Sequence, residues 1–239
     1  MTTRRRRRYP RGVRVRPFPK PPEGSSREST LPAVGLILVT FALFWMLPGH
    51  FKPVPAVLMI ALYLVLAALV VVFVPHRHSR VERWQRTLVM LVIAAISISN
   101  GYDLVRLIET LLTKNQPLTG RELILSAGVI WLTNVIVFAL WFWELDGGGP
   151  GRRAAARDDP SLTVYPDFQF PQMENPRFAP PGWHPRLVDY VYFAFSNGTA
   201  FSATDVMPLS HWAKGLMMVQ AGSSLLLVVL VTARAVNVL

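Results

Sequence analysis

The sequence predicts an all-α membrane protein, a helical bundle of about five transmembrane helices with a short extra helix before the last one. Two observations carry this prediction. Hydrophobic residues make up 51% of the 239 positions and charged residues only 16%, whereas a soluble domain carries roughly 25% charged residues. The hydrophobic residues also gather into stretches that approach the ~20 residues a helix needs to cross a bilayer. Such stretches are expected to be helical, because a helix satisfies its own backbone hydrogen bonds in lipid.

Four apolar stretches in the first part of the chain predict four crossings. The first has 17 residues without a charge and the second has 21, and each is followed by a proline, which ends a helix. The third becomes amphipathic toward its end, and the fourth is apolar apart from Thr133 and Asn134. These predicted spans are 31–47, 54–74, 87–112 and 122–143.

The last third of the chain predicts one further crossing and one element whose path stays open. A polar, proline-rich stretch, 145–186, is expected to be a loop on a surface. The apolar element 190–203 that comes next has 14 residues, about 21 Å as a helix, which is short for a crossing. It either re-enters from one face of the membrane or crosses it. A full-length helix is predicted at 212–238, with Ser210 as its N-cap.

Basic residues predict the orientation of the first four spans. Residues 1–30 hold ten Arg or Lys and two Glu, a net charge of +8 out of +11 for the chain, together with five prolines. We expect this arm to be disordered and cytoplasmic, ahead of a transmembrane domain at 31–239. The arm is expected to bind anionic lipid headgroups and not nucleic acid, because it has no fold that reads bases. The candidate lipid-binding residues are Arg4, Arg5, Arg6, Arg7 and Arg8.

One segment near the C-terminus has the pattern of a pore loop. It reads Tyr190-Val-Tyr-Phe-Ala-Phe-Ser-Asn-Gly-Thr-Ala-Phe-Ser-Ala-Thr-Asp-Val-Met-Pro208 and precedes a predicted span. It resembles the pore helix, filter and inner helix of tetrameric cation channels, although Ser-Ala-Thr stands where those channels have Gly-Tyr-Gly. Because filter carbonyls need the backbone angles of glycine, the resemblance implies a low-selectivity path. The alternative is a short helix that packs against the bundle and conducts nothing. The candidate pore-lining residues are Thr199, Ser202, Thr204 and Asp205.

Three further motifs lie in the second half of the chain. They are Trp131-Leu-Thr-Asn-Val-Ile-Val-Phe-Ala-Leu-Trp-Phe-Trp-Glu-Leu-Asp-Gly-Gly-Gly-Pro150, Pro166-Asp-Phe-Gln-Phe-Pro-Gln-Met173, and the stretch from Asp189 to Ala233-Arg-Ala-Val-Asn237. Over roughly residues 119–239 the chain resembles an uncharacterised family of multi-pass membrane proteins common in actinobacteria. The resemblance implies a bacterial plasma membrane and brings no established activity.

The polar residues of the sequence do not form a recognisable catalytic or metal-binding pattern. There is no cysteine, and the five histidines lack the spacing of metal ligands, so we expect no metal, cofactor or catalytic residue. Glu144 and Asp146 end the fourth span and are expected to be solvated. Asp103, Arg106 and Glu109 stand three apart on one helical face, which allows an ion-pair ladder, although we expect a plain amphipathic turn near the outer membrane interface. Interhelical hydrogen bonds are expected from Asn134, Gln220, Ser223 and Ser224.

These features favour a structural or interaction membrane protein over an enzyme. The alternative is a low-selectivity ion channel or permease that uses the segment 190–208. A membrane enzyme in which Glu144, Asp146 and Asp205 meet is the third choice. The expected partners are the lipid bilayer, other membrane proteins or further copies of the chain, in a bacterial plasma membrane with the N-terminus in the cytoplasm.

Overall fold

The structure is a computed structural model, and it describes the chain from residue 31 to residue 238 with several gaps. Within the described residues the chain is mostly helical, and its regular structure otherwise consists of two short strands. The predicted arm 1–30, which includes Arg4 to Arg8, lies outside these residues, as does nearly all of the predicted span 54–74. The described residues are 31–47, 61, 64, 65, 68, 82–112, 119–159, 161–180, 182–199 and 204–238.

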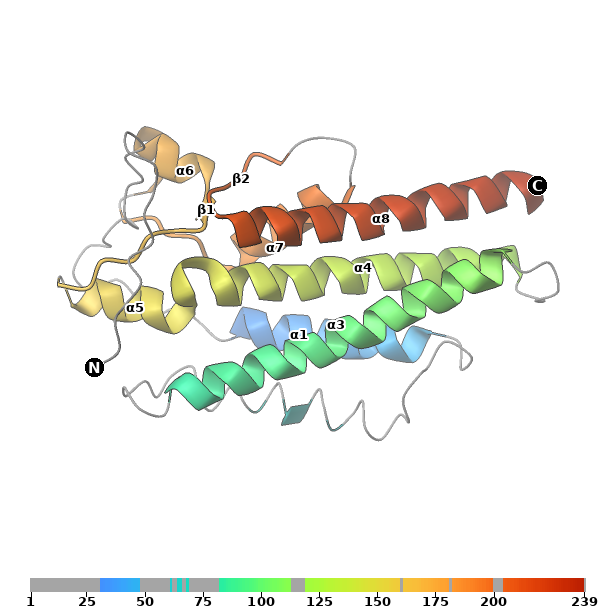
Figure 1. The fold of residues 1–239 in the computed structure, drawn as a ribbon, viewed down its shortest axis with the longest axis horizontal. Helices are drawn as coiled ribbons and strands as arrows, with labels where there is room; N and C mark the ends of the chain where they lie inside the picture. The colour runs from blue at the N-terminus through green and yellow to red at the C-terminus, as the bar shows by residue number, and fades with distance from the viewer. Residues whose placement is uncertain are drawn as a thin grey trace.

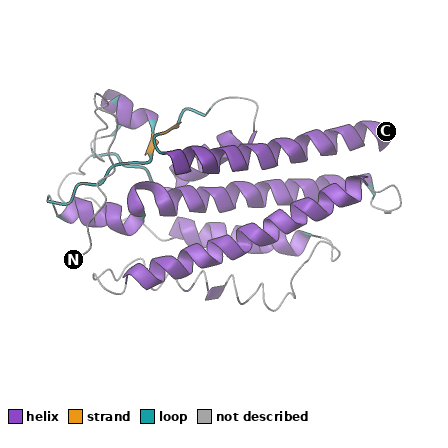
Figure 2. Cartoon of the chain, viewed as in Figure 1, coloured by secondary structure: helices purple, strands orange, loops and turns teal. Residues whose placement is uncertain are grey.

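In this part of the chain four long helices lie side by side and form the body of the molecule (Figures 1 and 2). They are α1 (Leu31–Met46), α3 (Glu82–Leu112), α4 (Gly120–Leu145) and α8 (His211–Val238). The central helix is α4, which packs against each of the other three. Its second half is buried almost continuously. The core of the bundle therefore runs along α4.

Three helical stretches among the described residues are long and apolar enough to cross a membrane. They coincide with the predicted spans that begin near 87, 122 and 212. The apolar part of α1 is shorter than a full crossing, and the predicted total of about five spans is not confirmed. The three stretches are Arg86–Leu112, Gly120–Ala156, which continues from α4 into the helix after it, and His211–Arg234.

Local signals begin two of these helices. The Thr119 hydroxyl accepts a hydrogen bond from the Glu122 backbone N–H at 3.3 Å, and the Glu122 carboxylate accepts one from the Thr119 N–H at 3.0 Å. This reciprocal pair is a capping box that starts α4. The Ser210 hydroxyl accepts a hydrogen bond from the Ala213 N–H at 3.4 Å at the start of α8. The N-cap predicted at Ser210 is confirmed.

A cap of short elements, which we define as residues 146–186 together with strand β2, covers one end of the bundle (Figure 1). Strands β1 and β2 pair antiparallel inside it. The sequence predicts a plain surface loop for most of this segment, and the structure differs, because buried hydrogen bonds of Asp146 and Asp167 hold the cap. Its elements are a 3-10 turn (Asp146–Gly148), α5 (Pro150–Asp158), β1 (Phe168–Gln169), α6 (Pro171–Glu174), a 3-10 turn (Pro176–Phe178) and β2 (Met207–Pro208).

One helix, α7 (Leu187–Thr199), runs only part of the way along the bundle. Near its start the Tyr190 hydroxyl donates to Asp146 in the cap. Near its end the Gly198 carbonyl accepts a hydrogen bond from Trp131, close to the middle of α4. Its 13 residues extend about 20 Å. The chain then returns to the cap, where β2 pairs with β1 and α8 begins. The starts of α7 and α8 therefore lie at the same end of the bundle, which favours re-entry over crossing for this short element.

An aromatic cluster joins α7 to α4 and to the cap. Phe142 of α4 and Phe193 of α7 stack with their ring centroids 4.5 Å apart. Phe168 of β1 packs edge-on against both, at 5.1 Å and 5.0 Å. Phe170 packs edge-on against Tyr190 at 5.2 Å. Because such pairs contribute roughly 0.5–1.5 kcal/mol each beyond burial, this cluster fixes α7 in place.

Candidate functional site

Two of the predicted pore-lining residues, Thr199 and Thr204, form local hydrogen bonds in the structure. The Thr199 hydroxyl, at the end of α7, donates to the Ser196 carbonyl at 2.8 Å. The Thr204 hydroxyl accepts a hydrogen bond from the Val206 N–H at 3.3 Å. Asp205 is exposed on the segment that returns to the cap, and Ser202 lies outside the described residues. The hydroxyls of Thr199 and Thr204 therefore form hydrogen bonds with backbone groups only two or three residues away.

The inner face of α7 is held to α8 by side-chain hydrogen bonds centred on Gln220, which is fully buried. The Gln220 amide donates to the Ala194 carbonyl at 2.7 Å and accepts from the Asn197 amide at 2.8 Å. The Asn197 amide also donates to the Met217 carbonyl at 3.1 Å. These bonds fix both the depth and the rotation of α7 against α8.

A second set of contacts holds α7 and α8 to α4. The Trp131 indole N–H donates to the Gly198 carbonyl at 3.0 Å, which satisfies one of the last carbonyls of α7, a group without a partner inside its own helix. The Asn134 amide donates to the hydroxyls of Ser223 and Ser224, each at 3.1 Å. The predicted interhelical role of these residues and of Gln220 is confirmed. In a membrane, apolar helices gain nothing by leaving lipid for one another, so hydrogen bonds of this kind help to hold them together.

Gly198 allows the close approach of α7 to its neighbours. A Cβ added at this position would lie 3.2 Å from Cγ2 of Val135 on α4 and 3.4 Å from Nε2 of Gln220 on α8. Both distances are tighter than or at the edge of normal contact, and the Val135 side chain is buried. The glycine in the pore-loop-like pattern therefore has a packing role in this structure.

Replacing Gln220 by methionine, which has similar length and no amide, is expected to lower the free energy of unfolding by about 1 kcal/mol. The reason is that Asn197 and the Ala194 carbonyl each lose a partner, and interhelical hydrogen bonds average roughly 0.6 kcal/mol with a maximum near 1.7. Unfolding of the purified protein in mixed micelles measures the change. Met218→Leu on the exposed face of α8 is the matched control, and an equal loss there would contradict the assignment.

Asp146 is the centre of a hydrogen-bond network at the junction of α4, α7 and the cap. One of its carboxylate oxygens accepts from the backbone N–H groups of Asp167 at 2.6 Å and Phe168 at 3.3 Å. The other accepts from the Tyr190 hydroxyl at 2.6 Å. The side chain is fully buried, with 0% exposure. The expectation that Asp146 and Glu144 are solvated end charges is wrong, because the cap folds over the end of α4.

Asp167 extends this network to the start of α8. Its carboxylate accepts from the Gly147 N–H at 3.2 Å and from the Trp212 indole N–H at 3.1 Å. Asp146 and Asp167 thus each bind the backbone of the other's segment, 21 residues apart in the chain. Both carboxylates accept hydrogen bonds from groups that hold the fold together, which favours a structural role over acid–base chemistry.

Two arginines also contribute to this junction of α4, α7 and the cap. The Arg153 guanidinium of α5 donates to the carbonyls of Trp143 at 2.9 Å and Asp146 at 2.6 Å, and it lies 5.5 Å from the ring centroid of Tyr190. These carbonyls belong to the C-terminal end of α4, where a cation is favourable. Arg86 of α3 lies 3.3 Å from the Glu144 carboxylate and also donates to the Glu144 carbonyl at 3.2 Å. The cap, α3 and α4 are therefore tied at one end.

A separate polar site lies toward the other end of α3. Arg106 and Glu109 form an exposed ion pair at 2.8 Å, as an ion-pair ladder requires. Asp103 points away from that pair into the bundle and is only 4% exposed. The three residues therefore do not form one ladder. Among the described residues no three His, Cys, Asp or Glu side chains gather in a way that could hold a metal ion.

Comparison with known proteins leaves the chain without an identified relative. It matches no known protein-family model, and no curated protein and no solved structure is significantly similar to it.

Proposed function

We propose that this chain is a multi-pass integral membrane protein that works by contact with other proteins in the membrane, not by catalysis. One observation carries the proposal: α7 is fixed on its inner side by hydrogen bonds and aromatic packing, while its outer side is apolar and largely exposed among the described residues. That outer side holds Val188, Tyr192 and Phe195, which are 64%, 60% and 46% exposed. Their spacing of four and three residues places them on one face of the helix.

The position of this face favours protein over lipid as its cover. If α3, α4 and α8 cross the membrane, the end of α7 beside Trp131 lies near the depth at which α4 is half crossed. The last carbonyls of α7 have no backbone partner within the helix at that depth, and such groups are tolerated only where they are covered by protein or line a water-filled cavity. The apolar outer face does not favour water. A second copy of the chain offers the same face in return and gives a symmetric dimer.

A photo-reactive phenylalanine analogue in place of Tyr192 tests this contact in intact membranes. We expect a crosslinked product with twice the mass of the chain. The same analogue at Leu125, an exposed position on α4, is the control and is expected to give mainly lipid adducts. A Tyr192 position that reacts only with lipid, or liposomes in which ion flux rises in proportion to the protein content, would contradict the proposed function.

The proposed orientation has the N-terminus and the cap in the cytoplasm of a bacterial cell. It is supported by the basic residues of 1–30 and 75–86, since such residues are retained on the cytoplasmic side. The cap lies at the end of the bundle where α1 begins (Figure 1), so this orientation places the N-terminus and the cap on the same side of the membrane. Arg4 to Arg8 are then close to the anionic inner leaflet.

A second candidate function, a low-selectivity cation channel or permease, is favoured by the direction of α7. Its C-terminal end is aimed into the bundle, and that end of a helix carries partial negative charge. Thr199 lies there, and Asp205 is exposed on the returning segment. In liposomes that pass cations, Asp205→Asn is expected to lower the flux, whereas unchanged flux would remove Asp205 from the path.

A further inference from the structure

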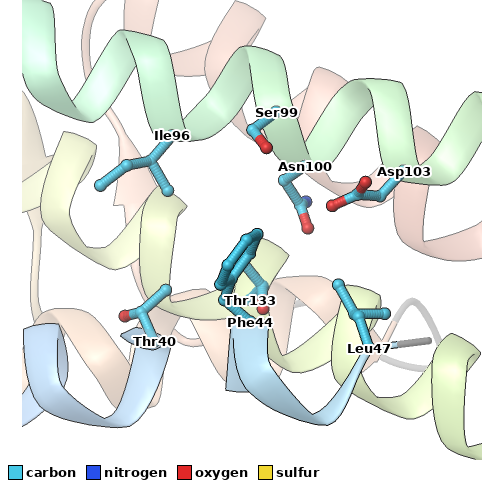
Figure 3. A pocket seen from close by; sticks show the side chains of 8 residues that line it. All are labelled: Thr40, Phe44, Leu47, Ile96, Ser99, Asn100, Asp103 and Thr133. Carbon is cyan, nitrogen blue, oxygen red and sulfur yellow. The ribbon is translucent and has the colours of Figure 1, made fainter. Parts of the chain in front are cut away.

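A small polar cavity lies between α1, α3 and α4, away from α7 and the cap. Its volume is about 10 Å³, which is close to the size of one water-sized particle. Figure 3 shows the carboxylate of Asp103 and the side chains of Ser99 and Asn100 gathered on α3 at one wall of this cavity, with Phe44 of α1 opposite them. The remaining lining comes from Thr40, Leu47, Ile96 and Thr133.

Asp103 is the unusual member of this group. Its side chain is more than nine-tenths buried, at 4% exposure. One of its carboxylate oxygens has no hydrogen-bond partner among the described residues. An ionised carboxylate held in a stretch that is apolar enough to cross a membrane is expensive unless a positive charge compensates it. Such a residue is a candidate functional group by default.

Among the described residues, none supplies that positive charge at the cavity. The nearest arginine along α3, Arg106, forms its ion pair with Glu109 on the exposed side of the helix. Every lining residue other than Asp103 is uncharged. The lining instead offers neutral oxygens: the hydroxyls of Ser99 and Thr133, and the amide of Asn100. Oxygen atoms of carboxylates, amides and hydroxyls are the ligands that hard metal cations prefer.

We propose that this cavity binds one small monovalent metal cation, for which Na⁺ is the probe. Asp103 supplies the compensating charge, and Ser99, Asn100 and Thr133 supply neutral oxygen ligands from two helices. The single carboxylate favours a single positive charge, because a divalent ion would leave a net charge in the apolar bundle. The small volume favours a cation that has shed its water. By joining α3 to α4, the ion stabilises the packing of the bundle.

The test is the thermal stability of the purified full-length protein as Na⁺ replaces N-methylglucamine at constant ionic strength, in alkaline buffer so that protons do not compete. Binding to the folded state raises Tm with ligand concentration. We expect Tm to rise with the logarithm of the Na⁺ concentration once it exceeds the Kd, by roughly 5 °C or more when Na⁺ is ~100-fold above the Kd. No response to Na⁺ overturns the proposal and leaves Asp103 as a carboxyl group neutralised by a proton.

Single substitutions show whether the rise in Tm with Na⁺ comes from this cavity. Asp103→Asn is expected to abolish the Na⁺ response, and Thr133→Val, which keeps the side-chain shape, is expected to raise the half-saturating Na⁺ concentration roughly tenfold through the loss of one ligand. If Asp103→Asn does not fold, Thr133→Val decides alone. Glu109→Gln, an exposed carboxylate on the same helix, is the control and should respond like the wild type. Equal responses in all of these proteins overturn the proposal. None of these outcomes depends on α7 or on the proposed protein contact.

Discussion

Replacing Asp146 by alanine is expected to lower the free energy of unfolding by about 3–5 kcal/mol, the cost of removing one partner from a buried charged network. The Asp146 carboxylate accepts three hydrogen bonds, from two backbone N–H groups of the cap and from the Tyr190 hydroxyl. All three donors would be left in a site without solvent, and each unsatisfied donor costs roughly 1–3 kcal/mol. The loss affects three elements, since α4, α7 and the cap all meet at this carboxylate.

Equilibrium unfolding in mixed micelles measures this effect, with Asp146→Asn and Tyr190→Phe as graded variants. The asparagine keeps the shape of the side chain and one acceptor oxygen for the two backbone N–H groups, but it loses the charge and places an NH₂ group opposite Tyr190, so part of the loss should remain. Tyr190→Phe removes one hydrogen bond to a charged group and is expected to cost about 1.5–3 kcal/mol. Glu174→Ala, on the exposed side of α6, should stay within roughly 0.5 kcal/mol of the wild type. A tolerated alanine at 146 would mean that the cap does not hold the bundle end.

Gly149→Ala is expected to be the second most damaging of these changes, with a loss of about 2–4 kcal/mol. Gly149 has φ of +96° and ψ of 165°, a backbone conformation that is essentially restricted to glycine. An added Cβ would also lie 2.8 Å from the Glu144 carbonyl oxygen, which belongs to the end of α4 and cannot move aside. The turn from α4 into α5 would have to open, and with it the position of Arg153.

The matched control is Gly215→Ala, because an added Cβ there meets nothing within 4 Å in the interior of α8. Alanine is favoured over glycine inside a helix by roughly 1 kcal/mol, so this variant should be as stable as the wild type or slightly more stable. If both substitutions have the same effect, the conformation at Gly149 does not define the turn.

Much of the helical bundle can be predicted from the sequence, for a simple physical reason. A crossing helix needs a continuous apolar stretch and satisfies its own backbone, so the three helices long and apolar enough to cross a membrane and the N-cap at Ser210 are determined locally. The path of α7 is not. Its short apolar segment fits either a return or a thin crossing, and the choice depends on contacts with distant residues, such as Trp131 to Gly198 and Tyr190 to Asp146.

The two polar sites escaped prediction for different reasons. Asp146 and Asp167 are 21 residues apart and bind backbone N–H groups, for which a sequence has no pattern. The position of Asp103 escaped prediction because of the geometry of the helix. A spacing of three in a helix with 3.6 residues per turn rotates by about 60° per step, so Asp103 and Glu109 differ by about 120°. That rotation turns Asp103 into the bundle while Arg106 and Glu109 stay outside.

The central claim is that α7 enters the bundle and returns to the end from which it came. Because the chain has no cysteine, single cysteines at Glu174, Asp205 and Arg121 can be labelled in intact cells and in inverted vesicles with a membrane-impermeant maleimide. All three positions are exposed. We expect Glu174→Cys and Asp205→Cys to react from the same side of the membrane and Arg121→Cys to react from the other. Labelling of Asp205→Cys from the Arg121 side would mean that α7 crosses the membrane, and would contradict the claim.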